Sequence, residues 1–154
     1  MSRSSRPLLA LLAVLVLAGC SGGEDRLTKS QYEQKVRSVY SGVQAAFEST
    51  RDKTGSQLAG RIDNARQELL SAAEELEAVE PPEAVEEENE ELVEGMREYA
   101  ESLEGIRSAA ERNDAAAIGE FNLGLANNEA VEQMAEAAEE MKFKGYDLGR
   151  IAEE

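Results

Sequence analysis

The chain has 154 residues, with one cysteine, no histidine and a formal net charge of −16 at neutral pH. Without histidine it lacks the usual general base and the commonest metal ligand, and its single thiol has no second cysteine or histidine as a partner for redox or nucleophilic chemistry. The negative charge repels phosphate backbones and anionic headgroups, which excludes nucleic acid as an expected partner and favours basic proteins or cations.

The first segment has the three parts of a secretory signal peptide. Arg3 and Arg6 make its start basic, an apolar run extends from Leu8 to Ala18, and small residues follow. A transmembrane helix needs about 20 apolar residues, so this run is too short to span a bilayer. We therefore expect residues 1–19 to be a signal peptide that is removed.

The segment ends in Leu17-Ala18-Gly19-Cys20, which resembles the lipobox of bacterial prolipoproteins. The resemblance covers residues 1–20 only. It implies cleavage between Gly19 and Cys20 and acylation of the Cys20 thiol, with palmitate-type chains that anchor the protein to the extracytoplasmic face of the cell membrane. Several acyl chains on one residue anchor stably, whereas a single chain binds only marginally. The alternative is an ordinary signal peptide with a chance cysteine.

The mature chain would begin with a tether and continue as one helical domain. Residues 20–27 are polar and contain glycine, which predicts a flexible linker. Residues 28–154 are rich in Ala, Glu, Leu and Arg, with prolines only at positions 81 and 82 and no alternation typical of strands. This composition favours helix throughout. We expect helices at about 29–53, 57–79, 83–112 and 115–142.

The first three of these helices have clear signals. Thr28 and Gln31 form the pattern of a capping box at the start of the first helix, and Thr54-Gly55-Ser56 predicts the turn after it. Pro81-Pro82 separates the second helix from the third. Both of these helices carry residues at alternating spacings of four and three, all of them apolar except Asn89: Leu58, Ile62, Ala65, Leu69, Ala72, Leu76 and Val79, then Val85, Asn89, Leu92, Met96, Tyr99, Leu103, Ile106 and Ala110.

The fourth helix is less regular because its apolar residues form two stripes on nearly opposite faces. One stripe contains Ile118, Phe121 and Leu125, and the other contains Leu123, Val131, Met134, Ala138 and Met141. The helix either bends near Gly124 to Asn128 or is covered on two sides in its first half. At its end, Gly145 suits a left-handed cap, and Met141 and Tyr146 occupy the paired apolar positions of that cap.

Short connections between helices force neighbours to run antiparallel. The predicted fold class is therefore all-α, an up-down-up-down four-helix bundle that needs no disulfides. The regular apolar seams could instead serve a coiled coil between chains, but short loops favour packing within one chain.

The acidic residues are the remaining candidates for chemistry. A dimetal bundle needs Glu-x-x-His pairs, and the chain has no histidine. The heptad phase of residues 83–112 places most glutamates on the solvent side, with Glu86 and Glu88 flanking the seam. We therefore predict a solvated acidic face, no metal centre, no cofactor and no catalytic residues, and leave weak surface binding of divalent cations as an alternative.

Asn89 lies in the seam of the third helix, and Asn127 lies on the second stripe of the fourth helix. A buried amide is costly unless it is hydrogen-bonded, and a lone amide in a seam often fixes the register. The two could meet as a buried polar contact across the bundle. A small polar pocket for a ligand and simple exposure near helix ends are the alternatives.

The stretch from Leu76 through Pro81-Pro82 to Val85, with Asn89 beyond it, resembles a hinge in small helical envelope lipoproteins of high-GC, actinobacterial-type bacteria. That resemblance implies His where this chain has Asn89, and it implies no known activity. The sequence thus favours a lipid-anchored, non-enzymatic envelope lipoprotein that binds an envelope protein or acts as a spacer. The alternative is a lipoprotein that binds cations or a small solute.

Overall fold

The computed structural model describes residues 26–124 and 127–149, so the leader, the lipobox and Cys20 lie outside the described residues. The described part is helical. A short 3₁₀ turn, Glu83–Val85, precedes the third of its five α-helices, which are α1 (Lys29–Glu48), α2 (Gly55–Glu77), α3 (Glu86–Glu111), α4 (Ala115–Gly124) and α5 (Glu129–Phe143). None of these helices is long and apolar enough to cross a membrane.

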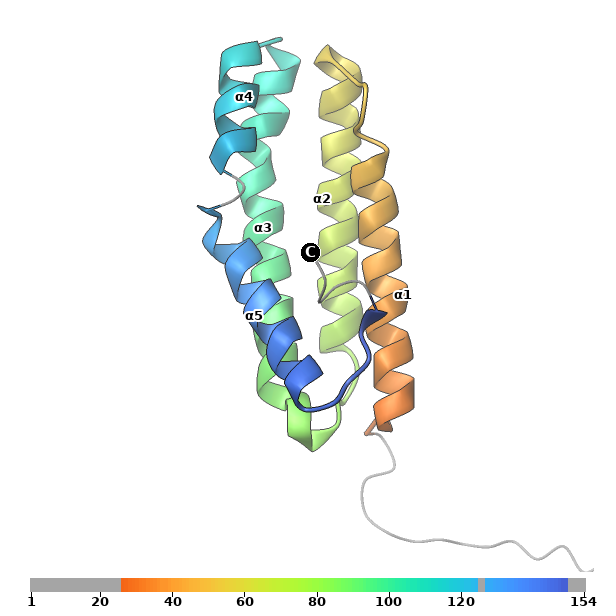
Figure 1. Cartoon of the computed structure of the whole chain (residues 1–154). Coiled ribbons are helices and arrows are strands. Elements are labelled where there is room, and N and C mark those ends of the chain that lie inside the picture. The colour runs from red at the N-terminus through yellow and green to blue at the C-terminus, as the bar shows by residue number, and fades with distance from the viewer. Residues whose placement is uncertain (1–25, 125–126, 150–154) are drawn as a thin grey trace, which may run out of the picture.

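The helices lie side by side with their neighbours antiparallel (Figure 1). α1 packs against α2, α2 packs against α3, and α3 carries both α4 and α5, which follow one another along its length. In the described part of the chain, no comparable packing joins α1 to α5. The side between these two helices is therefore the open side of the fold.

The start of α1 confirms the predicted capping box. The backbone N–H of Thr28 donates to Gln31 Oε1 at 2.9 Å, and the N–H of Gln31 donates to Thr28 Oγ1 at 3.4 Å. The helix ends at Glu48 rather than near residue 53. After it, the hydroxyls of Ser49 and Thr50 donate to carbonyls three residues back, an arrangement that competes with the helical ladder, and Asp52 then takes a φ of 59°.

The seams predicted for the second and third helices are confirmed in α2 and α3. In α2 the buried positions are Ala59, Ile62, Ala65, Leu69, Ala72, Ala73 and Leu76. In α3 they are Glu88, Asn89, Leu92, Val93, Gly95, Met96, Ala100, Leu103, Ile106, Ala109 and Ala110. The buried face of α3 is wider than one seam because α2 and α5 pack on it from different directions.

The predicted helix 115–142 is two helices, α4 and α5, with the break at the point where the two stripes change faces. Each helix has its own N-terminal cap. Asp114 Oδ1 accepts a hydrogen bond from the N–H of Ala117 at 3.1 Å, and Asn128 Oδ1 accepts one from the N–H of Val131 at 3.2 Å. The break lets both helices turn an apolar face toward α3.

The end of α5 confirms the predicted left-handed cap. Gly145 has a φ of 86°, its N–H donates to the Lys142 carbonyl at 2.9 Å, and the N–H of Tyr146 donates to the Met141 carbonyl at 3.0 Å. The closing segment, Gly145–Gly149, then crosses to α1. Its Tyr146 and Leu148 are buried there.

A glycine allows α5 to approach α3 closely. A Cβ atom on Gly95 would lie 2.6 Å from Met134 Cγ and 3.1 Å from the Ala130 carbonyl oxygen, closer than side chains normally pack. Gly95 thus accounts for the close contact of α5 with α3. Because α5 packs closely on α3, it does not close the gap between itself and α1.

Candidate functional site

The open side of the fold contains a cavity of about 560 Å³ between α1 and α5. We call it the apolar groove. Its lining residues are Val36, Tyr40, Val43, Gln44, Phe47, Glu48, Thr50 and Arg51 from α1 and the turn after it, Leu69 from α2, Leu92, Met96 and Tyr99 from α3, and Val131, Met134 and Ala135 from α5.

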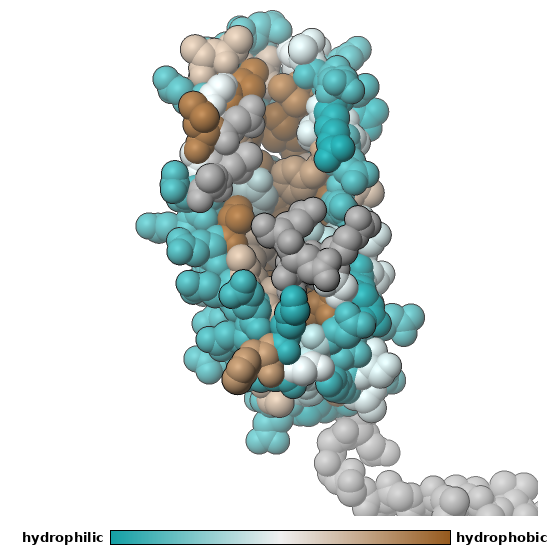
Figure 2. Space-filling model, viewed as in Figure 1, coloured by the Kyte–Doolittle hydropathy of each residue, from teal (hydrophilic) through white to brown (hydrophobic). Residues whose placement is uncertain are grey.

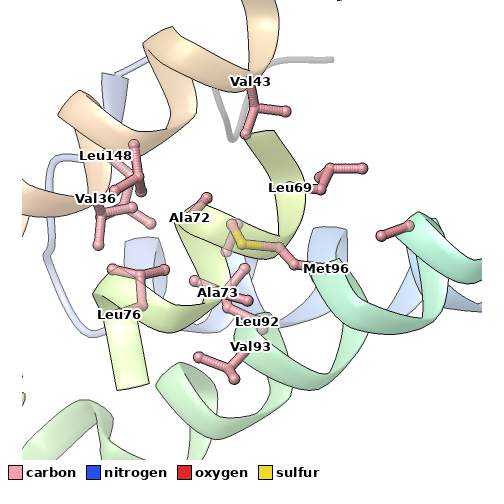
Figure 3. Packing of buried hydrophobic residues seen from close by; sticks show 14 of the residues in the cluster. Val36, Val43, Leu69, Ala72, Ala73, Leu76, Leu92, Val93, Met96 and Leu148 are labelled. Atoms are coloured by element: carbon pink, nitrogen blue, oxygen red, sulfur yellow. The ribbon is translucent and has the colours of Figure 1, made fainter. Parts of the chain in front are cut away.

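The floor of the groove is formed by side chains of the hydrophobic core. Leu69, Leu92 and Met96 belong to the same buried cluster as Val36 and Val43 (Figure 3). From outside, Figure 2 shows apolar surface in the hollow between the column of α4 and α5 and the column of α1. A site of this kind attracts apolar ligands because covering it removes hydrocarbon surface from water.

The lining that α1 and its following turn give the groove runs from Val36 to Arg51, and an aromatic contact lies near each end of it. One turn before Val36, Tyr32 meets the ring of Tyr146 in the closing segment edge-on at 6.1 Å, and its hydroxyl donates to Asn89 Oδ1 at 2.9 Å. At the other end Phe47 stacks on Tyr99 with ring centroids 5.6 Å apart. At 1.5 Å per residue, the α1 lining from Val36 to Glu48 is about 18 Å long. The groove is thus long and narrow.

The polar lining residues Gln44, Glu48, Thr50 and Arg51 come from α1 and the turn after it, and they gather toward one end of the groove. Gln44 is half-buried within the groove, and Glu48, Thr50 and Arg51 follow at the C-terminal end of α1. The Thr50 hydroxyl donates its proton to the Phe47 carbonyl at 2.7 Å, which leaves its oxygen as an acceptor. The groove is therefore apolar over most of its length and polar at the Phe47–Tyr99 end.

The structure places the two predicted amides apart. Asn89 is 5% exposed, accepts from Tyr32 and donates through Nδ2 to the Leu76 carbonyl at 3.4 Å. Burial raises the pKa of Tyr32, so its hydroxyl remains a donor to Asn89. Asn127 is exposed beside the α4–α5 break, in a separate shallow polar hollow. The predicted Asn89–Asn127 contact is not formed, because the helix break carries Asn127 to the surface.

Glu88 departs from the position predicted for it. The heptad phase placed it on the flank of the seam, but it is 2% exposed and forms an ion pair with Lys144. Burial alone raises the pKa of the Glu88 carboxyl, but the hydrogen bond and charge of Lys144 outweigh burial and hold the pKa below its ordinary value. This pair joins α3 to the last turn of α5 and so fixes one wall of the groove.

The other glutamates of α3 mostly face solvent, as predicted, while Glu91 is half-buried. Burial and the charges of Glu140 and Glu87 raise the pKa of Glu91. In the described ranges, no group of three acidic or cysteine side chains is placed to hold a metal ion.

Replacing Lys144 by methionine is expected to destabilise the protein most near neutral pH. Glu88 would then be buried without its cation, and burial would raise its pKa. In the wild-type chain the lowered pKa contributes stability above the ordinary carboxyl pKa, and this contribution is lost as the pH falls through the folded value. The stability difference between wild type and Lys144→Met should therefore be largest at neutral pH, shrink as Glu88 of the variant becomes protonated, and be smallest below about pH 4.

Urea unfolding at several pH values measures that difference. Lys35→Met is the matched control, because it removes a lysine from an exposed ion pair with Glu75, and such pairs contribute little. A Lys144→Met penalty no larger than the control, or one that does not change with pH, would contradict the role given to the buried pair.

Comparison with family models, with curated proteins and with solved structures finds no match. The groove was also not predicted from the sequence, which placed Leu69, Leu92, Met96 and Tyr99 in apolar seams. The only signal for it was the irregular fourth helix, since a helix with two apolar faces cannot close one side of a bundle evenly.

Proposed function

We propose that the chain is an envelope lipoprotein, anchored through Cys20, whose non-enzymatic helical domain binds an apolar ligand in the groove between α1 and α5. The domain would be a four-helix bundle in which α4 and α5 share the fourth position. The Leu17-Ala18-Gly19-Cys20 motif supports the anchor. The groove supports the binding role, and the absence of histidine from the whole chain supports a function without catalysis.

The observation that carries the binding role is the size and lining of the groove. Small-molecule sites typically have volumes of about 300–1,000 Å³, apolar and aromatic walls, and a few polar groups, and they occur between the helices of bundles. The groove has a volume of about 560 Å³ and is lined by Val, Leu, Met, Phe and Tyr side chains with four polar residues. This arrangement favours the small-solute alternative over a plain spacer.

A protein partner is the second candidate, and a different surface favours it. Phe143 is 95% exposed and Leu123 is 80% exposed, although both are large apolar side chains. Phe143 borders a shallow hollow with Glu136, Glu139 and Glu140. An apolar side chain among carboxylates suits a basic partner surface.

Binding of Nile red, an apolar dye that fluoresces in apolar sites, tests the proposed function. The described core comes entirely from residues after Arg26, so the segment from Ser21 to Glu154 retains the whole described core and can be used without detergent. Ala135→Trp places a large ring at the groove and is expected to weaken dye binding at least tenfold. Glu136→Trp, on an exposed neighbouring position outside the groove, is the control and should leave binding unchanged.

The absence of saturable dye binding would overturn the proposed function. Equal effects of Ala135→Trp and Glu136→Trp would also overturn it, because the dye would then bind elsewhere. Circular dichroism and thermal unfolding of both variants show whether each remains folded.

A further inference from the structure

We propose that the groove holds a single-chain lipid whose polar head carries no net charge, with its hydrocarbon chain over the floor and its head at the Phe47–Tyr99 end. This inference rests on the proposed function and names the ligand class. It follows from three features of the groove: its shape, the position of its polar residues and the balance of their charges.

The shape suits one hydrocarbon chain. The α1 lining of the groove is about 18 Å long, from Val36 to Glu48. An α-helix is about 10–12 Å across, so a helix of that length would occupy roughly three times the volume of the groove. A partner helix would therefore rest on the rim, whereas an extended chain can lie on the floor.

The floor offers that chain a continuous apolar path. Val36, Leu92 and Met96 line it toward the Tyr32 end, and Val131 and Met134 line it from α5. Methionine side chains adapt to irregular ligands because they are unbranched and flexible. Between Val36 and Gln44, Tyr40 is the one α1 lining residue with a polar group, so most of the polar groups that line the groove lie at the other end.

The head position follows from Gln44, Glu48, Thr50 and Arg51. These residues provide an amide, a carboxylate, a hydroxyl acceptor and a guanidinium. The guanidinium disfavours a cationic head, and the chain as a whole, with a net charge of −16, disfavours an anionic one. One positive and one negative side chain beside neutral hydrogen-bonding groups match a hydroxyl-rich or zwitterionic head without net charge.

Displacement of Nile red from the Ser21 to Glu154 chain tests this ligand class. The competitors share one hydrocarbon chain, and each is used below the concentration at which it forms micelles. Monooleoylglycerol and oleoyl lysophosphatidylcholine have no net charge, oleic acid is anionic and oleylamine is cationic. We expect the two neutral-head lipids to displace the dye at concentrations at least fivefold lower than the two charged ones.

A double variant, Gln44→Leu with Arg51→Met, tests the position of the head. It is expected to weaken binding of monooleoylglycerol about tenfold while binding of Nile red, which needs no polar contacts there, stays within twofold of wild type. Arg61→Met removes an exposed arginine of α2 that does not line the groove, and it should change neither affinity.

The outcomes separate the two proposals. If Nile red does not bind, or if Ala135→Trp does not block it, the proposed function itself fails. If the dye binds in the groove but all four lipids compete equally, or the double variant binds monooleoylglycerol like wild type, only the ligand class proposed here is overturned.

Discussion

Replacing Tyr32 by alanine is expected to lower the free energy of unfolding by about 3–5 kcal/mol, the range typical of a fully buried aromatic residue. Tyr32 is 0% exposed, meets Tyr146 edge-on and donates to Asn89. Its loss would leave a cavity between α1, α3 and the closing segment. It would also leave the Asn89 carbonyl oxygen without its hydroxyl partner.

Tyr32→Phe separates the contribution of the buried ring from that of the hydroxyl. The ring and its contact with Tyr146 remain, and only the hydroxyl, which contacts Asn89 Oδ1 and Met141 Sδ, is removed, so the expected loss is about 1–3 kcal/mol. Urea unfolding followed by circular dichroism measures both variants. If Tyr32→Ala lowers the free energy of unfolding by less than about 1 kcal/mol, Tyr32 does not hold α1 against α3 and the closing segment.

Cys20→Ser is expected to abolish acylation and leave the signal peptide uncut, because a serine hydroxyl does not replace the thiolate as the nucleophile that accepts a diacylglycerol. The measurement is metabolic labelling with an alkyne fatty acid in a bacterial host, together with the mass of the N-terminal peptide. Ser21→Ala changes the next residue without touching the thiol and should be labelled and cut like wild type.

A labelled Cys20→Ser chain, or a wild-type chain that is cut but carries no label, would contradict the lipid anchor. The groove proposal would then stand independently, because Nile red binding is measured on a chain without the leader and Cys20. The two parts of the proposed function can thus fail separately.

The arrangement of the chain relates the anchor to the groove. The domain begins where the N–H of Leu27 donates to the Glu80 carbonyl at 2.8 Å and Arg26 pairs with Glu86, next to the start of α1. The polar end of the groove lies at the other end of α1, about 30 Å away at 1.5 Å per residue. An anchored domain would therefore present the head of a bound lipid away from the tether.

Local features of the fold could be predicted from the sequence because they depend on neighbours along the chain. The Thr28 capping box, the left-handed cap at Gly145 and the seam of α2 each need only residues within one or two turns. The early end of α1 could not be predicted in this way. There the hydroxyls of Ser49 and Thr50 bond to backbone carbonyls in competition with the helical hydrogen bonds. The apolar spacing is compatible both with a helix that ends at Glu48 and with one that continues to residue 53.

The candidate site could not be predicted because it depends on which helices approach one another. The heptad phase of α3 gives one seam, but α2 and α5 bury two adjoining faces, so Glu88 becomes buried and pairs with Lys144. Likewise, Val36, Met96 and Met134 are ordinary core residues in sequence. They line a groove only because α5 packs on α3 at Gly95 and leaves a gap between itself and α1.

The methionines allow the most direct test of the central claim, that the groove is the binding site. After the leader, the chain contains three methionines: Met96 and Met134 line the groove, and Met141 is fully buried in the core. In a chain with labelled methionine methyl groups, titration with monooleoylglycerol should shift the NMR signals of Met96 and Met134 in a saturable manner and leave Met141 in place. Unchanged Met96 and Met134 signals, or equal shifts of all three, would contradict the claim.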